Sequence, residues 1–425
     1  MDVTAAEKQE RPRGGEWSRR GVLSGLLGAP VLLLAACQGG GSKATPGGNG
    51  GGSAPAGGGE TQSVSPKASV AQITITPADG ATAAPFTAPV TVTVQNGTLT
   101  SVTVTDGTGK QIAGELAADG ASWTSTAKLA SGSTYTVAAA AEDKDKRPAD
   151  ANASFSTASP ANTFVGYFTP EDGATVGVGM PVSINFNKAI TDRRAVEQAI
   201  TVVADPPVEI VGHWVDATRL DFRPQQYWAK GTTVTLKLRL KDVAGAKGVY
   251  GTQSKNVTFT VGRSQVSVAD LKAGTLTVST DGRVTATYPV IGGSPDHRTW
   301  AGKMVISERF QQTRMNSATV GLGSEYDIPD VPHAQRLTTS GTFIHGNYWS
   351  PASQFGNANT SHGCIALQDV QGGGNPDTSG ARFFASSMVG DVVEVVNSGD
   401  RTVNPSNGLN GWNMSWADWK AGSAL

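Results

Sequence analysis

The heptapeptide TPADGAT at residues 76–82 recurs as TPEDGAT at residues 169–175. Each copy is followed by segments in which apolar and polar residues alternate, namely PVTVTV (89–94), SVTVTD (101–106), PVSINF (181–186) and TVTLKLRL (233–240). Alternation with this period is typical of strands that are buried on one face. The repeat therefore predicts two tandem immunoglobulin-like β-sandwiches, over residues 71–160 and 161–263, neither of which has a cysteine pair. Within the second, DRRAVEQAI (192–200) predicts a short helix.

The composition limits the number of domains and the kinds of partner. At 425 residues, and with about 150 residues per domain, the chain has room for two or three domains. A net charge of −1 and a charged fraction of 16% leave no basic surplus, which argues against a nucleic-acid partner. Abundant glycine, with recurring Val, Thr and Ser, favours strands and turns. The expected fold class is therefore mainly β.

Residues 1–37 have the pattern of an export signal. Several arginines precede an apolar stretch from Val22 to Ala36, which is too short for a comfortable membrane span and matches a signal-peptide core. The ending LLAAC resembles a bacterial lipobox, which implies cleavage before Cys37 and lipidation of its thiol. SRRGVL (18–23) is similar to a twin-arginine signal, so the Sec and twin-arginine routes both stay open. The alternatives are a plain cleaved signal or a short anchor helix.

Residues 38–70 separate this signal from the first predicted sandwich. GGGSKATPGGNGGGSAPAGGGETQSVSP (39–66) has almost no apolar side chains and cannot form a core. As a random coil it would span roughly 30 Å. We expect a tether that lets a protein, anchored by lipid to the outer face of the cytoplasmic membrane, work away from that membrane.

A third region, 264–397, renews the strand pattern and closes with the strand-like DVVEVVN (391–397). It holds Cys364, one of only two cysteines in the chain. If Cys37 carries lipid, Cys364 has no disulfide partner. A lone thiol outside the cell has to be buried or chemically used.

The stretch FIHGNYWSPASQFGNANTSHGCIAL (343–367) brings His345, His362 and Cys364 together in the sequence. A nucleophilic cysteine needs an imidazole that takes its proton and a third group that orients the imidazole. A glycine-containing turn before the thiol can expose backbone amides to an oxyanion. Two alternatives remain open. Cys364 could be a buried apolar cysteine, or it could bind zinc with His345, His362 and His333, although a single residue between His362 and Cys364 is cramped for a tetrahedral site.

This motif resembles the signature of the L,D-transpeptidases of bacterial cell walls, which is a histidine followed, after fifteen or so residues, by Ser/Thr-His-Gly-Cys. Here His345 is followed by Ser361-His362-Gly363-Cys364. The resemblance implies that Cys364 is the acylated nucleophile and His345 the general base. It also implies that the amides of Gly363 and Cys364 hold the oxyanion.

The same resemblance implies a substrate site. Residues expected around the substrate are Met315, where the lid begins, Tyr326 on that lid, Trp349 at the mouth, and Asn359, Ser361 and His362. Some relatives have serine where this chain has Gly346, so the carbonyl of Gly346 is the group expected to orient His345. Many relatives have Asn or Arg where this chain has Ala366. His213 and His297 are expected to lie outside the site.

The implied reaction is a 3→3 cross-link between peptidoglycan stem peptides, without a metal or organic cofactor. The donor is a stem tetrapeptide that loses D-alanine, and the acceptor is an amine of a neighbouring stem. Carbapenem-type β-lactams are the implied inhibitors. The alternatives are an L,D-carboxypeptidase acting on the same donor and a non-catalytic lipoprotein that binds the cell wall.

The tail, residues 398–425, contains GLNGWNMSWADWKAG (408–422), which also resembles actinobacterial members of that family. Trp412, Trp416 and Trp419 are spaced to lie on one face of a short helix. Because an exposed face of this kind would be a large apolar patch, we expect it to pack onto a domain rather than to bind a partner or a sugar.

Overall fold

A computed structural model describes residues 67–425. The predicted signal, the lipid attachment at Cys37 and nearly all of the tether lie outside the described residues. Within them, no helix has both the length and the hydropathy that a membrane crossing requires.

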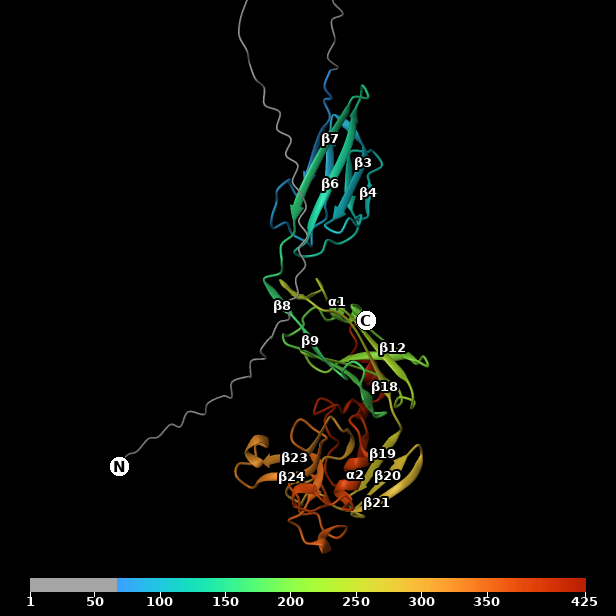
Figure 1. Ribbon diagram of the computed structural model, residues 1–425, viewed down its shortest axis with the longest axis vertical. Coiled ribbons are helices and arrows are strands. Elements are labelled where there is room, and N and C mark those ends of the chain that lie inside the picture. The colour runs from blue at the N-terminus through green and yellow to red at the C-terminus, as the bar shows by residue number, and fades with distance from the viewer. Residues whose placement is uncertain (1–66) are drawn as a thin grey trace, which may run out of the picture. The chain divides into compact units, whose positions relative to one another are not determined.

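The first sandwich consists of two facing sheets. One has the strand order β1 (Gln72–Thr76), β2 (Thr91–Gln95), β5 (Ser122–Ser125) and β4 (Gly114–Leu116), and the other has β3 (Gly97–Asp106), β6 (Thr134–Asp143) and β7 (Pro148–Ser156). Figure 1 shows the long strands β3, β6 and β7 side by side. In β2 the two valines are buried and the residues between and after them are exposed, so the alternation in the sequence places one side-chain row in the core.

The second sandwich has the same construction, with an added small sheet. Its sheets are, in strand order, β13 (Ile210–Trp214), β14 (Arg219–Pro224), β11 (Val182–Phe186) and β9 (Gly166–Thr169); β10 (Thr175–Val176), β18 (Ser254–Val261), β15 (Thr233–Arg239) and β12 (Ile200–Asp205); and β16 (Ala244–Ala246), β17 (Val249–Gly251) and β8 (Asn162–Phe164). The expected helix is α1 (Arg193–Gln198), capped by the Asp192 carboxylate, which accepts from the amide of Ala195 at 3.1 Å.

The third region is built on a nine-stranded sheet. The strands run in the order β22 (Gly302–Val305), β27 (Val392–Val396), β19 (Gln265–Asp270), β20 (Thr275–Thr280), β21 (Arg283–Ile291), β26 (Ile365–Gln368), β25 (Phe343–Asn347), β24 (Asp327–Arg336) and β23 (Glu308–Asn316). Figure 1 shows β19, β20 and β21 as neighbouring strands, with α2 (Ser379–Ser386) in the same region. Short 3-10 helices are η1 (Ser317–Val320), η2 (Ala352–Gln354) and η3 (Gln371–Gly373). Strands β25 and β26 are parallel neighbours, and they carry the motif residues.

The tail does not form one helix across its three tryptophans. Trp412 lies in the 3-10 helix η4 (Gly411–Asn413), and α3 (Trp416–Ala421) begins after Ser415. All three rings nevertheless surround the guanidinium of Arg223 in β14, with ring centres 4.7, 5.3 and 4.3 Å from it for Trp412, Trp416 and Trp419. The tail therefore packs onto the second sandwich, as expected.

Indole hydrogen bonds fix the tail on the same sandwich. Trp412 Nε1 donates to the carbonyl of Gly179 at 2.7 Å, and Trp419 Nε1 donates to that of Val211 at 3.0 Å. On its other side, the tail contacts the third region, where Asn410 Oδ1 accepts from the amide of Val305 at 3.0 Å. The tail thus joins the second sandwich to the region that holds the motif.

Candidate active site

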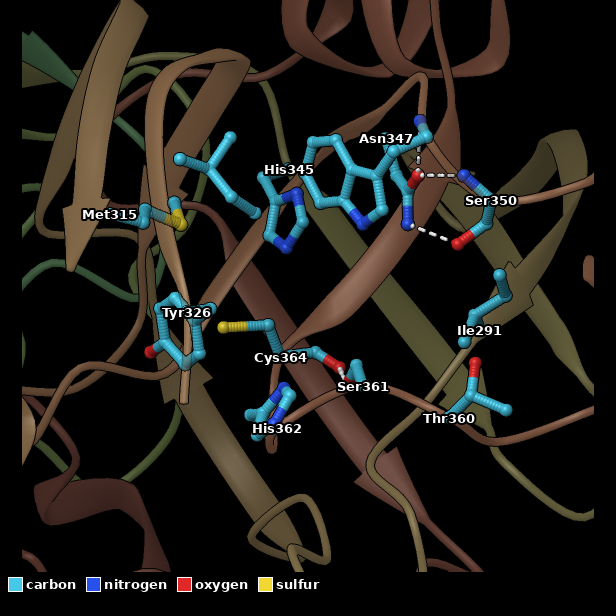
Figure 2. Close-up of a pocket in the computed structure, with 12 residues that line it drawn as sticks. Ile291, Met315, Tyr326, His345, Asn347, Ser350, Thr360, Ser361, His362 and Cys364 are labelled. Atoms are coloured by element: carbon cyan, nitrogen blue, oxygen red, sulfur yellow. Dashed lines mark hydrogen bonds between the residues drawn. The ribbon is translucent and has the colours of Figure 1, made fainter. Parts of the chain in front are cut away.

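His345 and Cys364 face one cavity because their strands are parallel neighbours. His345 is in β25, and Cys364 immediately precedes β26, in a register that pairs His345 with Ala366. The cavity has a volume of about 230 Å³ and is lined by Ile291, Met315, Tyr326, Ile328, His345, Asn347, Trp349, Ser350, Thr360, Ser361, His362 and Cys364. Figure 2 shows His345, Tyr326 and Met315 around the end of the Cys364 side chain.

The ring of His345 is held in one tautomer. Its Nδ1 atom lies 2.8 Å from the carbonyl oxygen of Gly346. Because a carbonyl only accepts, Nδ1 carries the hydrogen, and Nε2 is left as the basic atom. Burial lowers the pKa of His345 below its ordinary value, against the opposing effects of the Gly346 carbonyl and the Asp369 carboxylate. The imidazole is therefore neutral and able to accept a proton at neutral pH.

The thiol of Cys364 is 8% exposed. The amide of Phe343 donates to Sγ at 3.4 Å, and the thiol is directed at the carbonyl of Gly341, 3.7 Å away. Burial raises the pKa of Cys364 to about 11. No hydrogen bond within residues 67–425 joins Sγ to the His345 ring. The resting pair is therefore a neutral thiol and a neutral imidazole, and a hydrogen bond between them has to form before the proton is transferred.

The turn before the thiol is closed by Ser361. Gly363 has a φ of +104°, in the region that favours glycine. Ser361 Oγ donates to the carbonyl of Cys364 at 2.7 Å and accepts from the amide of Gly363 at 3.3 Å. Since the amide of Gly363, expected at the oxyanion, is engaged by this hydroxyl, the amide of Cys364 is the better candidate donor.

A buried carboxylate occupies the space beside Gly346. A Cβ atom at this position would lie 2.2 Å from Asp369 Oδ2, so only glycine fits there. Asp369 is held by His333, whose Nδ1 lies 2.7 Å from Oδ2, and by Thr378, whose hydroxyl donates to Oδ1 at 2.9 Å. Glycine in place of the serine of some relatives is thus explained by the approach of this carboxylate to β25.

Five of the six residues expected around the substrate line the cavity: Met315, Tyr326, Trp349, Ser361 and His362. The ring of Trp349 is stacked on that of His345, with centres 5.8 Å apart and planes inclined by 19°. Asn359 lies outside the cavity lining. Its side chain accepts from the amide of Gly292 at 2.8 Å and donates to the carbonyl of Leu271 at 2.9 Å, so it ties three backbone segments together.

Sequence reasoning missed several residues of the cavity. Asn347 Oδ1 accepts from the amides of Trp349 and Ser350, at 3.0 and 2.9 Å, and so holds the indole over His345. The string NYWS was a usable signal, because asparagine commonly caps the two or three residues that follow it. Ile291 and Ile328 also line the cavity, but nothing in the sequence distinguishes them from core residues.

The histidines are grouped differently from the zinc alternative that the sequence left open. His333 is turned to Asp369 and lies outside the cavity lining. His297, expected outside the site, lies outside the cavity lining but packs against His362, with ring centres 5.0 Å apart. Glu325 Oε2 lies 3.2 Å from the Nε2 atom of each of these two rings. In the described part of the chain, this trio is the only group of three or more His, Cys, Asp or Glu residues whose potential ligand atoms lie close enough together to share a metal ion.

Comparisons with known proteins agree with this geometry. Residues 81–244, which include parts of both sandwiches, match the bacterial Ig domain family, and residues 264–372 match the L,D-transpeptidase catalytic domain. L,D-transpeptidase 2 of Mycobacterium tuberculosis is 34% identical over 84% of this chain and 85% of its own length. L,D-transpeptidase 5 of that species is 32% identical over 83% of this chain and 77% of its own length.

The similar solved structures cover little more than half of this chain. The structure of LD transpeptidase LdtMt1 in complex with imipenem is 32% identical, covers 56% of this chain and 100% of that chain, and has a TM-score of 0.46. Two relatives that are more than 30% identical each cover more than four fifths of this chain, and the catalytic-domain family matches the region of His345 and Cys364. The chain belongs to the L,D-transpeptidase family.

Proposed function

We propose that the chain forms 3→3 cross-links in peptidoglycan through a thioester on Cys364. The observation that supports this most is the arrangement of Cys364 and His345 at one cavity, with Nδ1 of His345 bound to the Gly346 carbonyl. That bond leaves Nε2 as a base that can serve a thiol in the same cavity. The donor would be a stem tetrapeptide, and the acceptor an amine on a neighbouring stem.

In the first half-reaction, Sγ of Cys364 attacks the carbonyl carbon between the third residue and the terminal D-alanine. The thiol proton passes to Nε2 of His345 as the sulfur–carbon bond forms. The amide of Cys364 donates to the oxyanion of the tetrahedral intermediate. When the carbon–nitrogen bond breaks, Nε2 returns the proton to the leaving amine of D-alanine.

The second half-reaction reverses these roles. The acceptor amine attacks the thioester carbon, Nε2 takes a proton from it, and the sulfur leaves and regains a proton from the imidazole. We expect the largely apolar wall formed by Ile291, Met315, Tyr326, Ile328 and Trp349 to reduce contact between water and the thioester. Exclusion of water favours transfer to an amine over hydrolysis.

Incubation with purified tetrapeptide stems tests transfer against hydrolysis. Cross-linked dimers with release of D-alanine support the proposal. Tripeptide without dimers identifies an L,D-carboxypeptidase, and no turnover by the wild type identifies a wall-binding protein. Cys364→Ala is the control, because it removes the only free thiol of the described residues.

We extend the proposal to β-lactams. A strained lactam carbonyl in place of the donor carbonyl would acylate the same sulfur, and ring opening would replace departure of D-alanine. Carbapenems are therefore proposed as covalent inhibitors that bind at Cys364. Their adduct also gives a direct readout of the first half-reaction.

We also propose that the protein is located at the outer face of the cytoplasmic membrane and is anchored there by lipid on Cys37. The sequence LLAAC after an apolar stretch supports it. Labelling with a radioactive fatty acid in a bacterial host should mark the wild type but not Cys37→Ala, which should be released in soluble form. A labelled Cys37→Ala protein would contradict the anchor.

A further inference from the structure

The trio of His297, Glu325 and His362 joins three segments that are far apart in the sequence. His297 lies in the loop between β21 and β22, Glu325 between η1 and β24, and His362 in the turn before Cys364. Their ligand atoms all lie within 4.8 Å of one another. Glu325 Oε2 is 3.2 Å from both Nε2 atoms.

These distances suit a small divalent ion. Zinc binds imidazole nitrogen and carboxylate oxygen at about 2.0–2.2 Å in a tetrahedral array, which places neighbouring ligand atoms about 3.3 Å apart. The two observed separations of 3.2 Å already match this spacing. Two imidazoles and one carboxylate are also a ligand set that zinc commonly uses, with a fourth position left for water.

The trio is positioned next to the lid. Glu325 immediately precedes Tyr326, which lines the cavity with Cys364. The ring of Tyr326 packs against that of His362, with centres 4.9 Å apart. An ion shared by Glu325, His297 and His362 would therefore tie the lid segment to the turn that carries the nucleophile.

We propose that His297, Glu325 and His362 form a binding site for a divalent ion of the Zn²⁺ class, and that the bound ion latches the Tyr326 lid over the cavity. The alternative is that the three side chains form an ion pair, without a metal, between the carboxylate and protonated histidines. It would hold the lid loosely, since the three side chains are 29%, 41% and 38% exposed for His297, Glu325 and His362. Coordination adds directional bonds that water screens far less.

The first experiment measures Zn²⁺ binding by the full chain, without a histidine tag, in competition with a chromogenic chelator. One ion per chain is expected for the wild type and for Cys364→Ser. Binding should weaken by about tenfold or more in His297→Gln and in Glu325→Gln, because each loses one of three ligands. Glu308→Gln is the matched control, since Glu308 is another partly exposed glutamate, paired with Arg336, and should bind as the wild type does.

Two outcomes would overturn the site. One is unchanged binding in both His297→Gln and Glu325→Gln. The other is loss of binding in Cys364→Ser with retention in His297→Gln, because the ion would then sit on the catalytic thiol.

The second experiment measures the effect on the lid, and this part rests on the proposed function. Zn²⁺ should slow carbapenem acylation of the wild type by roughly an order of magnitude, as expected when a ligand stabilises a closed lid. His297 lies outside the cavity lining. The His297→Gln variant should therefore be acylated as fast as the zinc-free wild type, both with and without Zn²⁺. An equal effect of Zn²⁺ on both proteins would overturn the latch. Failure of the wild type to be acylated without zinc would instead count against the proposed function, and the binding experiment would stand.

Discussion

The Nδ1 atom of His345 lies 2.8 Å from the carbonyl oxygen of Gly346, the next residue of β25. A backbone carbonyl here performs the orienting task that a third side chain performs in many triads. Its position is held by the sheet, because Gly346 is paired with Leu367 of β26. The tautomer of the base is therefore set by the fold itself.

The depressed pKa of His345 predicts the acid limit of activity. Protonation removes the lone pair that accepts the thiol proton, so the rate should fall as pH drops through the pKa of the folded enzyme. Burial holds that pKa below the ordinary 6.5. Carbapenem acylation followed from pH 8 downward should stay level past pH 6.5 and decline only below it. A midpoint at or above 6.5 would contradict a buried, neutral base.

Gly346→Ala should damage both stability and activity. Its Cβ would lie 2.2 Å from Asp369 Oδ2, and relief of such overpacking typically costs about 1–3 kcal/mol. Since the same shift moves the carbonyl that holds His345, acylation should slow as well. Gly374→Ala is the matched control, because a Cβ there meets nothing within 4 Å. Thermal unfolding and acylation rates that are equal in the two variants would count against this account of Gly346.

Asn347→Ala should release the indole of Trp349 from His345. The substitution removes the acceptor for the amides of Trp349 and Ser350. A small displacement of groups around a reacting pair can slow a reaction by about tenfold or more. We expect slower acylation with little loss of stability. Asn357→Ala, which removes only contacts to the carbonyls of Ser353 and Phe355, should leave the rate unchanged.

Trp419 should be the residue that secures the tail. Its ring is 1% exposed, stacks on His213 with centres 4.7 Å apart, and packs against Arg223. Truncation of a buried tryptophan typically costs about 3–5 kcal/mol, so Trp419→Ala should lower the midpoint of unfolding well below that of Trp416→Ala, whose ring is only half-buried. Deletion of residues 405–425 should have a larger effect than either. Unchanged melting and activity after that deletion would show that the tail does not secure the two domains.

The strands were predictable because their signal is local. In β15 the alternating burial follows directly from the sequence TVTLKLR, which the pattern over 233–240 predicted. The family motif likewise identified His345, which lies in β25, and Cys364, which immediately precedes the neighbouring strand β26. The prediction of one helix across all three tail tryptophans was wrong, although the sequence contained a signal for the true start of the helix. Ser415 and Asp418 form a capping pair, in which Ser415 Oγ accepts from the amide of Asp418 at 3.1 Å. That cap starts α3 after Trp412.

Other features depend on contacts that no local pattern encodes. His297 meets His362 only because the loop after β21 runs beside the turn before β26, where Ser294 donates its amide to the carbonyl of Ser361 at 2.8 Å. The position of Asn359 outside the cavity also follows from packing between distant segments, because its side chain bonds to Gly292 and Leu271. Sequence spacing along one strand could not predict them.

The most direct test of the account is the mass of the intact protein after exposure to a carbapenem. The wild type should gain one adduct per chain, on Cys364, and Cys364→Ala should gain none. His345→Gln should react about 10²–10⁴-fold more slowly, the usual contribution of a positioned general base. An adduct on Cys364→Ala, or acylation of His345→Gln at the wild-type rate, would contradict the claim that this thiol and this imidazole form the reactive pair.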